Sequence, residues 1–461
     1  MTAPPSAIIT PARSIELSEL DRTEWWDWWE YNKERFLGLD DVLARLHPIT
    51  PRGDDLVGPD LGRRAGLDAR RVYGELVPAL VSELEAEDNI LFRRRALLAL
   101  GRIGEAPKGF ESTVDSLSSV IASFLSSEQM GVAEAAVVAL GALETVDGVR
   151  ILCELLEDGE PGQARVGRNR VSVRMRALAA YGLGVSGAGE LPGAVRSFAV
   201  HSLVGALSAE GARYPDVQAA AVIAIGLIPL TETEDAGEHA PPSSCIPAQA
   251  RFLLSLLDEE QPRMVRNHAP TAVARLLEAS EHAEELHSLV IERLLEALDR
   301  GESVGVRRSS VIGLGLLADA DNDPLDVRVR EELFGLLSKG DLPSRSFAAI
   351  SLAQIASREG TGENPNAAVA TVSKSLTRHL VRGKSFERPW AALALGVMGF
   401  QLREKGSNLP KEAADALRGE LARERNSIES SAMALAAGMV GDPRATTRSS
   451  SESKRSAPTT S

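Results

Sequence analysis

Small and apolar residues recur in one short pattern along most of the chain. The pattern is a small residue, two apolar residues, a small residue, an apolar residue and often Gly, and residues 96–101 (ALLALG) show it first. Further copies end at Gly141, Gly182, Gly226, Ala274, Gly315, Ala353, Gly396 and Gly438. These nine copies stand about 40 residues apart, a period typical of a helical solenoid.

Each repeat is predicted to hold two helices. In the first repeat, apolar residues at positions 76, 77, 80, 81 and 84 predict one helix, and a second follows over 90–103 and ends at Gly104. Neither helix can bury its apolar face alone, so neighbouring repeats must stack. The sequence therefore predicts an all-α fold, an α-solenoid (superhelix) of about nine stacked antiparallel helix pairs.

The composition divides the chain into four segments. Residues 1–20 and 446–461 are rich in Pro, Ser and Thr and are predicted to be disordered. Residues 21–73 hold a Trp-rich helix and a linker, and residues 74–445 form the solenoid. After Gly441 the chain opens like a tenth repeat and then loses the pattern, so we expect an uncapped last repeat and hypothesise dimerisation through it.

The repeats over residues 74–441 resemble the HEAT-repeat family, including bacterial HEAT-like repeats related to phycobilisome lyases. This resemblance implies a ladder between repeats, made by an Asp in the turn and an Arg early in the second helix. Asp88 with Arg94 fits the ladder, and so do Arg174, Arg266, Arg307, Arg345 and Arg388. Pro270 lies inside the fifth second helix and is expected to kink or shorten it.

The sharpest local feature is the segment 25–31, which holds four of the five tryptophans. On a helix, Trp25, Trp28 and Trp29 share one face, and Phe36 extends it. One interpretation is that this helix folds back and caps the first repeat. The other is that its aromatic face docks a partner, as aromatic clusters do at interfaces.

A basic insertion over residues 159–176 interrupts the period, and we predict a long loop between the two helices of one pair. Insertions in solenoids often lie on the binding face. The insertion is thus the candidate site for an acidic or phosphorylated protein partner, unless it is a solvated loop that offsets acidic helices. The candidate residues are Arg165, Arg168, Arg170, Arg174 and Arg176, together with Arg93 and Arg94 two repeats earlier.

No catalytic, cofactor-binding or metal-binding set can be chosen from the sequence. Residues 182–187 (GLGVSG) match the dinucleotide fingerprint in letters, but they are predicted to end a helix, whereas that motif follows a strand. His282 and His287 are five residues apart, unlike the i, i+4 pair of a zinc site. We therefore expect no cofactor, no metal and no enzymatic activity.

Charge and composition indicate which class of partner is disfavoured and which compartment to expect. The net charge of −14 argues against nucleic acid as a partner, because such binding depends on neutralising phosphates. Two distant cysteines, Cys153 and Cys245, and the lack of a visible export signal or membrane span favour the cytoplasm. Only eight of the 51 basic residues are Lys, a bias that we interpret as bacterial.

The leading hypothesis is a non-catalytic scaffold for protein–protein interaction, which binds its partner on the concave face formed by the second helices. The resemblance to bilin lyases implies an alternative, a chaperone-like lyase that holds an open-chain tetrapyrrole. A second alternative is a HEAT-like DNA glycosylase, which the acidic net charge disfavours.

Overall fold

A computed structural model describes residues 24–37 and 69–441, apart from 87, 108–109, 111–113, 115, 209–213, 233–236, 238, 279, 281–283, 300–301 and 425. The segments 1–20 and 446–461, predicted to be disordered, lie outside the described residues, as does most of the linker.

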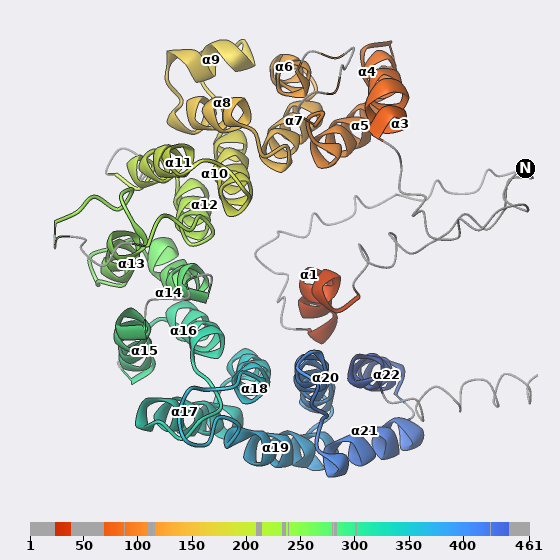
Figure 1. The fold of residues 1–461 in the computed structure, drawn as a ribbon, viewed down its shortest axis with the longest axis vertical. Helices are drawn as coiled ribbons and strands as arrows, with labels where there is room; N and C mark the ends of the chain where they lie inside the picture. The colour runs from red at the N-terminus through yellow and green to blue at the C-terminus, as the bar shows by residue number, and fades with distance from the viewer. Residues whose placement is uncertain are drawn as a thin grey trace, which may run out of the picture.

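The described helices form two layers that follow one curve, with an outer helix and an inner helix in each repeat (Figure 1). The outer helices are α4 (Val77–Ala86), α6 (Leu117–Ser123), α8 (Val146–Glu157), α11 (Gly193–Gly205), α13 (Ile246–Ser255), α15 (Glu284–Asp299), α17 (Pro324–Lys339), α19 (Ala368–Arg382) and α21 (Lys411–Arg423). The inner helices are α5 (Ile90–Ile103), α7 (Met130–Ala142), α10 (Val173–Ala188), α12 (Pro215–Ile225), α14 (Arg263–Glu278), α16 (Val304–Leu317), α18 (Leu342–Ser357), α20 (Arg388–Glu404) and α22 (Ser427–Val440). The all-α solenoid of nine helix pairs is thus confirmed over the described residues.

Four short helical elements extend this plan. The helix α3 (Ala69–Arg71) and a π-helical turn, η2 (Val72–Leu76), lead directly into α4, so the first outer helix begins earlier than its apolar stripe suggests. A 3-10 turn, η3 (Phe124–Ser126), ends α6, and α9 (Glu160–Val166) lies between α8 and α10.

Polar side chains fix the starts of many inner helices. The side chain of Asn89 accepts hydrogen bonds from the backbone N–H groups of Leu91 and Phe92 at the start of α5. Ser172, Ser303, Asp341 and Asn426 cap α10, α16, α18 and α22 in the same way. Because a cap satisfies backbone donors that the helix leaves free, these residues fix where the chain turns back inside a repeat.

Successive inner helices approach so closely that their backbones touch at Gly and Ala. A Cβ atom added to Gly101 of α5 would lie 2.6 Å from the backbone oxygen of Ala139 in α7, and one on Gly141 would lie 2.6 Å from the Cα of Gly182 in α10. We call the glycines that lie in such contacts the spine glycines; they are Gly101, Gly141, Gly184, Gly226, Gly315 and Gly396. The small residues of the repeat pattern are therefore the contact surface between repeats.

Two local predictions need correction. The segment 182–187 lies inside α10 and does not end a helix, because Gly182 and Gly184 are the residues that contact α7 and α12. The helix α14 continues through the buried Pro270 for 16 residues, so this proline does not shorten it.

The helix α1 (Trp25–Leu37) lies inside the curve, against the inner helices α20 and α22 of the last two repeats (Figure 1). The ring centroids of Phe36 and Phe400, in α1 and α20, are 5.0 Å apart with the rings edge to face. The expectation that this helix caps the first repeat is therefore wrong: its aromatic side chains pack at the opposite end of the solenoid. None of the described helices is both long and apolar enough to span a bilayer.

The backbone contacts predict the effect of adding one methyl group. Gly101→Ala and Gly141→Ala should lower the urea midpoint, because overpacking costs on the order of 1–3 kcal/mol and exceeds the ~1 kcal/mol that Ala gains in a helix. Gly335→Ala and Gly419→Ala serve as controls, since nothing lies within 4 Å of their added Cβ atoms. These two variants should be slightly stabilised, and equal destabilisation of all four would contradict close packing at the spine glycines.

Candidate binding surface

The concave face carries exposed apolar side chains in the middle of its first three helices. Each inner helix is covered by an outer helix behind it and by the next inner helix at its side, so its remaining mid-helix face points into the curve. Three residues before a spine glycine, this face holds Leu98 of α5, Val138 of α7 and Tyr181 of α10, which are 37%, 39% and 41% exposed. Val185, one turn after Tyr181, is 48% exposed. We call these four residues the N-terminal concave patch.

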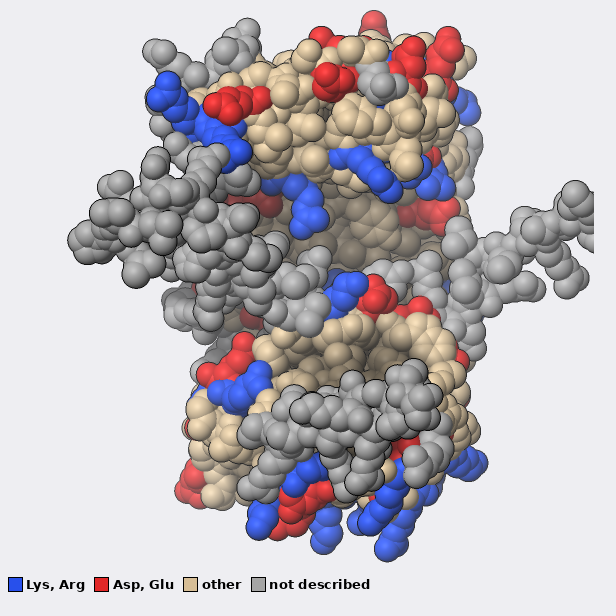
Figure 2. All heavy atoms as spheres, turned by 90° about the vertical axis from the view of Figure 1, so that its right-hand side faces the viewer, with Lys and Arg blue, Asp and Glu red and all other residues tan. Residues whose placement is uncertain are grey.

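Arginines surround this patch. Arg94, Arg95 and Arg102 of α5 and Arg174 of α10 are exposed, although the chain as a whole is acidic. Figure 2 looks into the hollow of the curve and shows Lys and Arg side chains along its upper edge, on the side of the N-terminal repeats. The surface is thus apolar in its centre and basic around it.

Acidic residues near the patch include Glu134 of α7 and the exposed Asp216 at the start of α12. Glu134 of α7 forms an ion pair with Arg174 of α10 at 2.9 Å. This ion pair joins α7 to α10 across the concave face. Burial, followed by the charge of Asp216, raises the pKa of the Tyr181 hydroxyl, so this ring stays neutral at physiological pH. The patch is therefore suited to an apolar partner segment with acidic flanks.

The structure separates the arginines that the sequence grouped. Arg94 lies over the start of α7, with its Cδ 3.5 Å from the position of a Cβ on Gly131, so Arg94 and Arg174 flank the same helix. Arg93 forms the ion pair with Asp88 at 2.9 Å, where the ladder pattern suggested Arg94. Arg168 and Arg170 are exposed in the turn before α10.

The basic insertion is not the long loop that was predicted. It contains α9 and the first turn of α10. Arg165 pairs with Glu154 of α8 at 2.9 Å, and its side chain lines a surface pocket between α6, α8 and α9 that is rich in serine hydroxyls. Arg176 donates to the backbone oxygen of Leu156 at 2.9 Å and packs over the ring of Tyr214. These two arginines therefore hold the outer helix α8 and do not form one surface with Arg174.

The Arg ladder that the resemblance implied is present in the second half of the solenoid. An Arg early in an inner helix pairs with an acid just before or at the start of the next inner helix, as for Arg308 with Asp341 at 3.7 Å. The other steps are Arg266 with Glu302, Arg345 with Glu387, and Arg388 with Glu429. In three of these steps the Nε of the Arg also donates to a backbone oxygen at or after the end of the outer helix of its own repeat, namely that of Leu257, Gly340 or Leu380. One side chain thus joins an outer helix, an inner helix and the next repeat.

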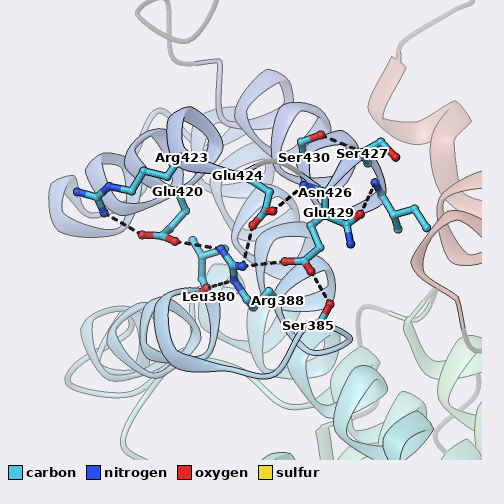
Figure 3. A network of polar contacts seen from close by, with 11 residues as sticks. Leu380, Ser385, Arg388, Glu420, Arg423, Glu424, Asn426, Ser427, Glu429 and Ser430 are labelled. Carbon is cyan, nitrogen blue, oxygen red and sulfur yellow. Dashed lines mark hydrogen bonds and ion pairs between the residues drawn. The ribbon is translucent and has the colours of Figure 1, made fainter.

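The last step of the ladder is the largest network (Figure 3). The guanidinium of Arg388 contacts Glu420 at 3.0 Å, Glu424 at 2.7 Å and Glu429 at 2.8 Å. Glu429 also accepts a hydrogen bond from the hydroxyl of Ser385. These carboxylates are at most 12% exposed, so they depend on Arg388 for compensation of their charge.

Three carboxylates meet in the turn between α16 and α17. Oxygens of Asp319, Asp321 and Asp326 lie within 4.8 Å of one another, close enough to hold a divalent cation. They also accept backbone N–H groups, from Asp321 at 3.0 Å, Gly362 at 2.8 Å and Asp319 at 2.8 Å respectively. Burial raises the pKa of Asp319 to about 6, and the charges of Asp326 and Asp321 add to the effect. These bonds give the cluster a structural role in shaping the turn.

Both cysteines, Cys153 and Cys245, are buried, and neither forms a disulfide. Burial raises the pKa of the Cys153 thiol to about 12, so this thiol stays protonated and is a poor nucleophile.

The sequence analysis missed the N-terminal concave patch. A signal was present, because the repeat pattern places two adjacent apolar residues, such as Leu97 and Leu98, where one helix can bury only one. Repeat stacking buries Leu97 completely and leaves Leu98 on the concave face.

The comparisons with known proteins agree with this architecture. Residues 77–166 match the family model for HEAT repeats, a stretch that spans α4 to α9. The helix pairs on either side of this stretch continue the same all-α repeat architecture through the described residues. A search of curated proteins finds no match to the chain.

The Arg388 network predicts a local loss of stability. Arg388→Ala leaves three largely buried carboxylates without a cation and should destabilise α21 and α22 by on the order of 2–3 kcal/mol. Faster hydrogen exchange confined to these helices would show the effect. Arg423→Ala is the control, because Arg423 contacts Glu420 at 3.1 Å but is 78% exposed, and its loss should change stability by less than ~0.5 kcal/mol. Equal effects of the two substitutions would contradict this account.

The raised pKa of Asp319 predicts that the stability of the fold depends on pH. The folded state binds the proton of the Asp319 carboxyl more tightly than the unfolded chain does. The stabilisation that comes from this proton is therefore lost as pH rises from about 4 through about 6. Asp319→Asn keeps an acceptor oxygen and removes the charge, so it should raise the thermal midpoint at pH 7.5 and change it little at pH 4. Asp88→Asn, at a side chain 94% exposed, should leave both midpoints unchanged. A midpoint for Asp319→Asn that falls at pH 7.5 would argue that the charge stabilises the turn.

Proposed function

We propose that this protein is a non-catalytic scaffold that binds a protein partner on its concave face, at the N-terminal concave patch. The observation that carries the proposal is the alignment of Leu98, Val138 and Tyr181, exposed at equivalent positions of three adjacent inner helices. Because these three helices are in backbone contact at Gly101 and Gly141, their equivalent positions lie next to one another, and we call the three side chains a strip. Contiguous exposed apolar surface with a polar rim is typical of an interaction site.

The surroundings of the strip indicate the partner. Arg94, Arg95, Arg102 and Arg174 would pair with carboxylates or phosphates at the edge of the partner, where charge steers association. An amphipathic helix with an apolar face and acidic flanks meets both requirements, in the mode by which grooves bind helices. This supports the earlier hypothesis of an acidic or phosphorylated partner and moves its site from the basic insertion to the concave face.

No observation on the described residues favours the bilin-lyase or the DNA-glycosylase alternative. The proposal includes the cytoplasm as the compartment, with the two reduced and buried cysteines as its support.

The test compares two surfaces of the same fold. Val138→Asp with Tyr181→Asp places charge on the patch, while Phe198→Asp with Leu289→Asp places it on outer helices, at residues 47% and 45% exposed. Tagged wild-type and variant chains are cross-linked in their native cells and purified. Unchanged circular dichroism and urea midpoints establish that both variants fold.

We expect a stoichiometric protein partner that co-purifies with the wild type and the outer-helix variant, and at least tenfold less with the patch variant. Retention of the partner by the patch variant, or its loss only from the outer-helix variant, would contradict a concave binding site.

A further inference from the structure

The concave face has different exposure at its two ends. The position three residues before a spine glycine is 37–41% exposed in α5, α7 and α10, but Leu393 at this position in α20 is completely buried. Val397, which corresponds to the exposed Val185, is completely buried as well. All residues from 391 to 400 of α20 are buried. The helix α1 contacts α20 and α22 inside the curve, so it lies against this buried end of the concave face.

The contact between α1 and the solenoid is aromatic. Phe36 packs edge to face on Phe400, and the rings of Trp28 and Trp29 each lie 5.9 Å from the ring of Phe36. Trp25, three turns earlier on α1, is only 8% exposed. The helix therefore lays one aromatic face into the curve, which is the way an amphipathic partner helix occupies a groove.

Polar contacts do not add to this attachment in the described side chains. Asn32 donates to the backbone oxygen of Trp28, and Lys33 pairs with Glu30, so both interactions stay within α1. The indole N–H of Trp25 is buried without an acceptor, which costs on the order of 1–3 kcal/mol. By contrast, α20 and α22 are joined by the Arg388 network. Among the described side chains, α1 is thus attached to the repeats by aromatic contacts alone.

The connection of α1 to the solenoid also matters. Residues 38–68 join α1 to α3, so α1 is tethered to the solenoid and its docking is intramolecular. A free helix of the same chemistry must overcome that advantage to replace α1.

From these observations we propose that the concave face of α20 and α22 is a receptor for an amphipathic helix with large aromatic residues, and that α1 is its displaceable internal occupant. The external ligand is a partner helix that presents aromatic side chains at the spacing of Trp25, Trp28 and Phe36. This proposal is independent of the N-terminal concave patch, since it concerns the opposite end of the strip.

The experiment uses the full chain and a labelled peptide of residues 24–37. The opened variant, Trp25→Ala with Trp28→Ala and Phe36→Ala, should bind the peptide at least tenfold more tightly than the wild type, at one peptide per chain. Adding Phe400→Ala to the opened variant should abolish binding. Adding Phe198→Ala, at an exposed aromatic residue of the outer helix α11, should leave it unchanged.

A second measurement uses the wild-type chain and needs no substitution. With excess unlabelled peptide, the α1 amides of the wild-type chain should exchange hydrogen faster, while the α20 amides stay protected. Equal peptide binding by wild-type and opened chains, binding by neither, or exchange in α1 that excess peptide does not change would each overturn the proposal. Light scattering checks whether α1 docks on its own chain. If the wild type has the mass of two chains and the opened variant that of one, α1 docks on a second copy and the proposal is wrong.

Discussion

The direct backbone contact between successive inner helices is the constraint on which the rest of this structure depends. Where Gly141 faces Gly182, and Gly226 faces Ala272, no room remains for a side chain on the first residue of each pair. Close packing of this kind maximises dispersion contacts, although each residue contributes little apolar area. It also fixes the rotation of every inner helix, because only the small-residue face can touch the neighbour. The residues that then point into the curve, and those that face the outer helices, follow from that rotation.

Polar interactions complement this packing in a way that differs along the chain. In the second half, Arg266, Arg308, Arg345 and Arg388 each reach the next repeat, and the hydroxyl of Ser351 donates to the backbone oxygen of Val311 in the preceding inner helix. In the first half, Arg93 pairs within its repeat and Arg174 pairs back to Glu134. The ladder therefore ties the C-terminal repeats more firmly, and these are the repeats on which α1 rests.

The concave face then has two parts that differ in exposure at one repeated position. At the N-terminal end, Leu98, Val138 and Tyr181 are open and surrounded by arginines, which suits an acidic helical partner. At the C-terminal end, Leu393 and Val397 are buried in α20, which the aromatic side chain of Phe36 in α1 contacts at Phe400. A strip that binds a helix of its own chain at one end supports the interpretation that it binds helices of other proteins along its length.

The all-α class and the nine helix pairs can be predicted from the sequence, because they follow from a short periodic pattern of small and apolar residues. Through the family resemblance it also placed Arg266, Arg345 and Arg388 in the ladder. At two other steps it named Arg94 and Arg307, whereas the neighbouring Arg93 and Arg308 form the ion pairs. The tertiary structure alone decided where α1 docks, that 182–187 lies within a helix, and that Arg165 and Arg174 face different partners. It alone showed which apolar residue of each repeat stays exposed. These features depend on contacts between residues far apart in the chain, and a short-range pattern cannot specify them.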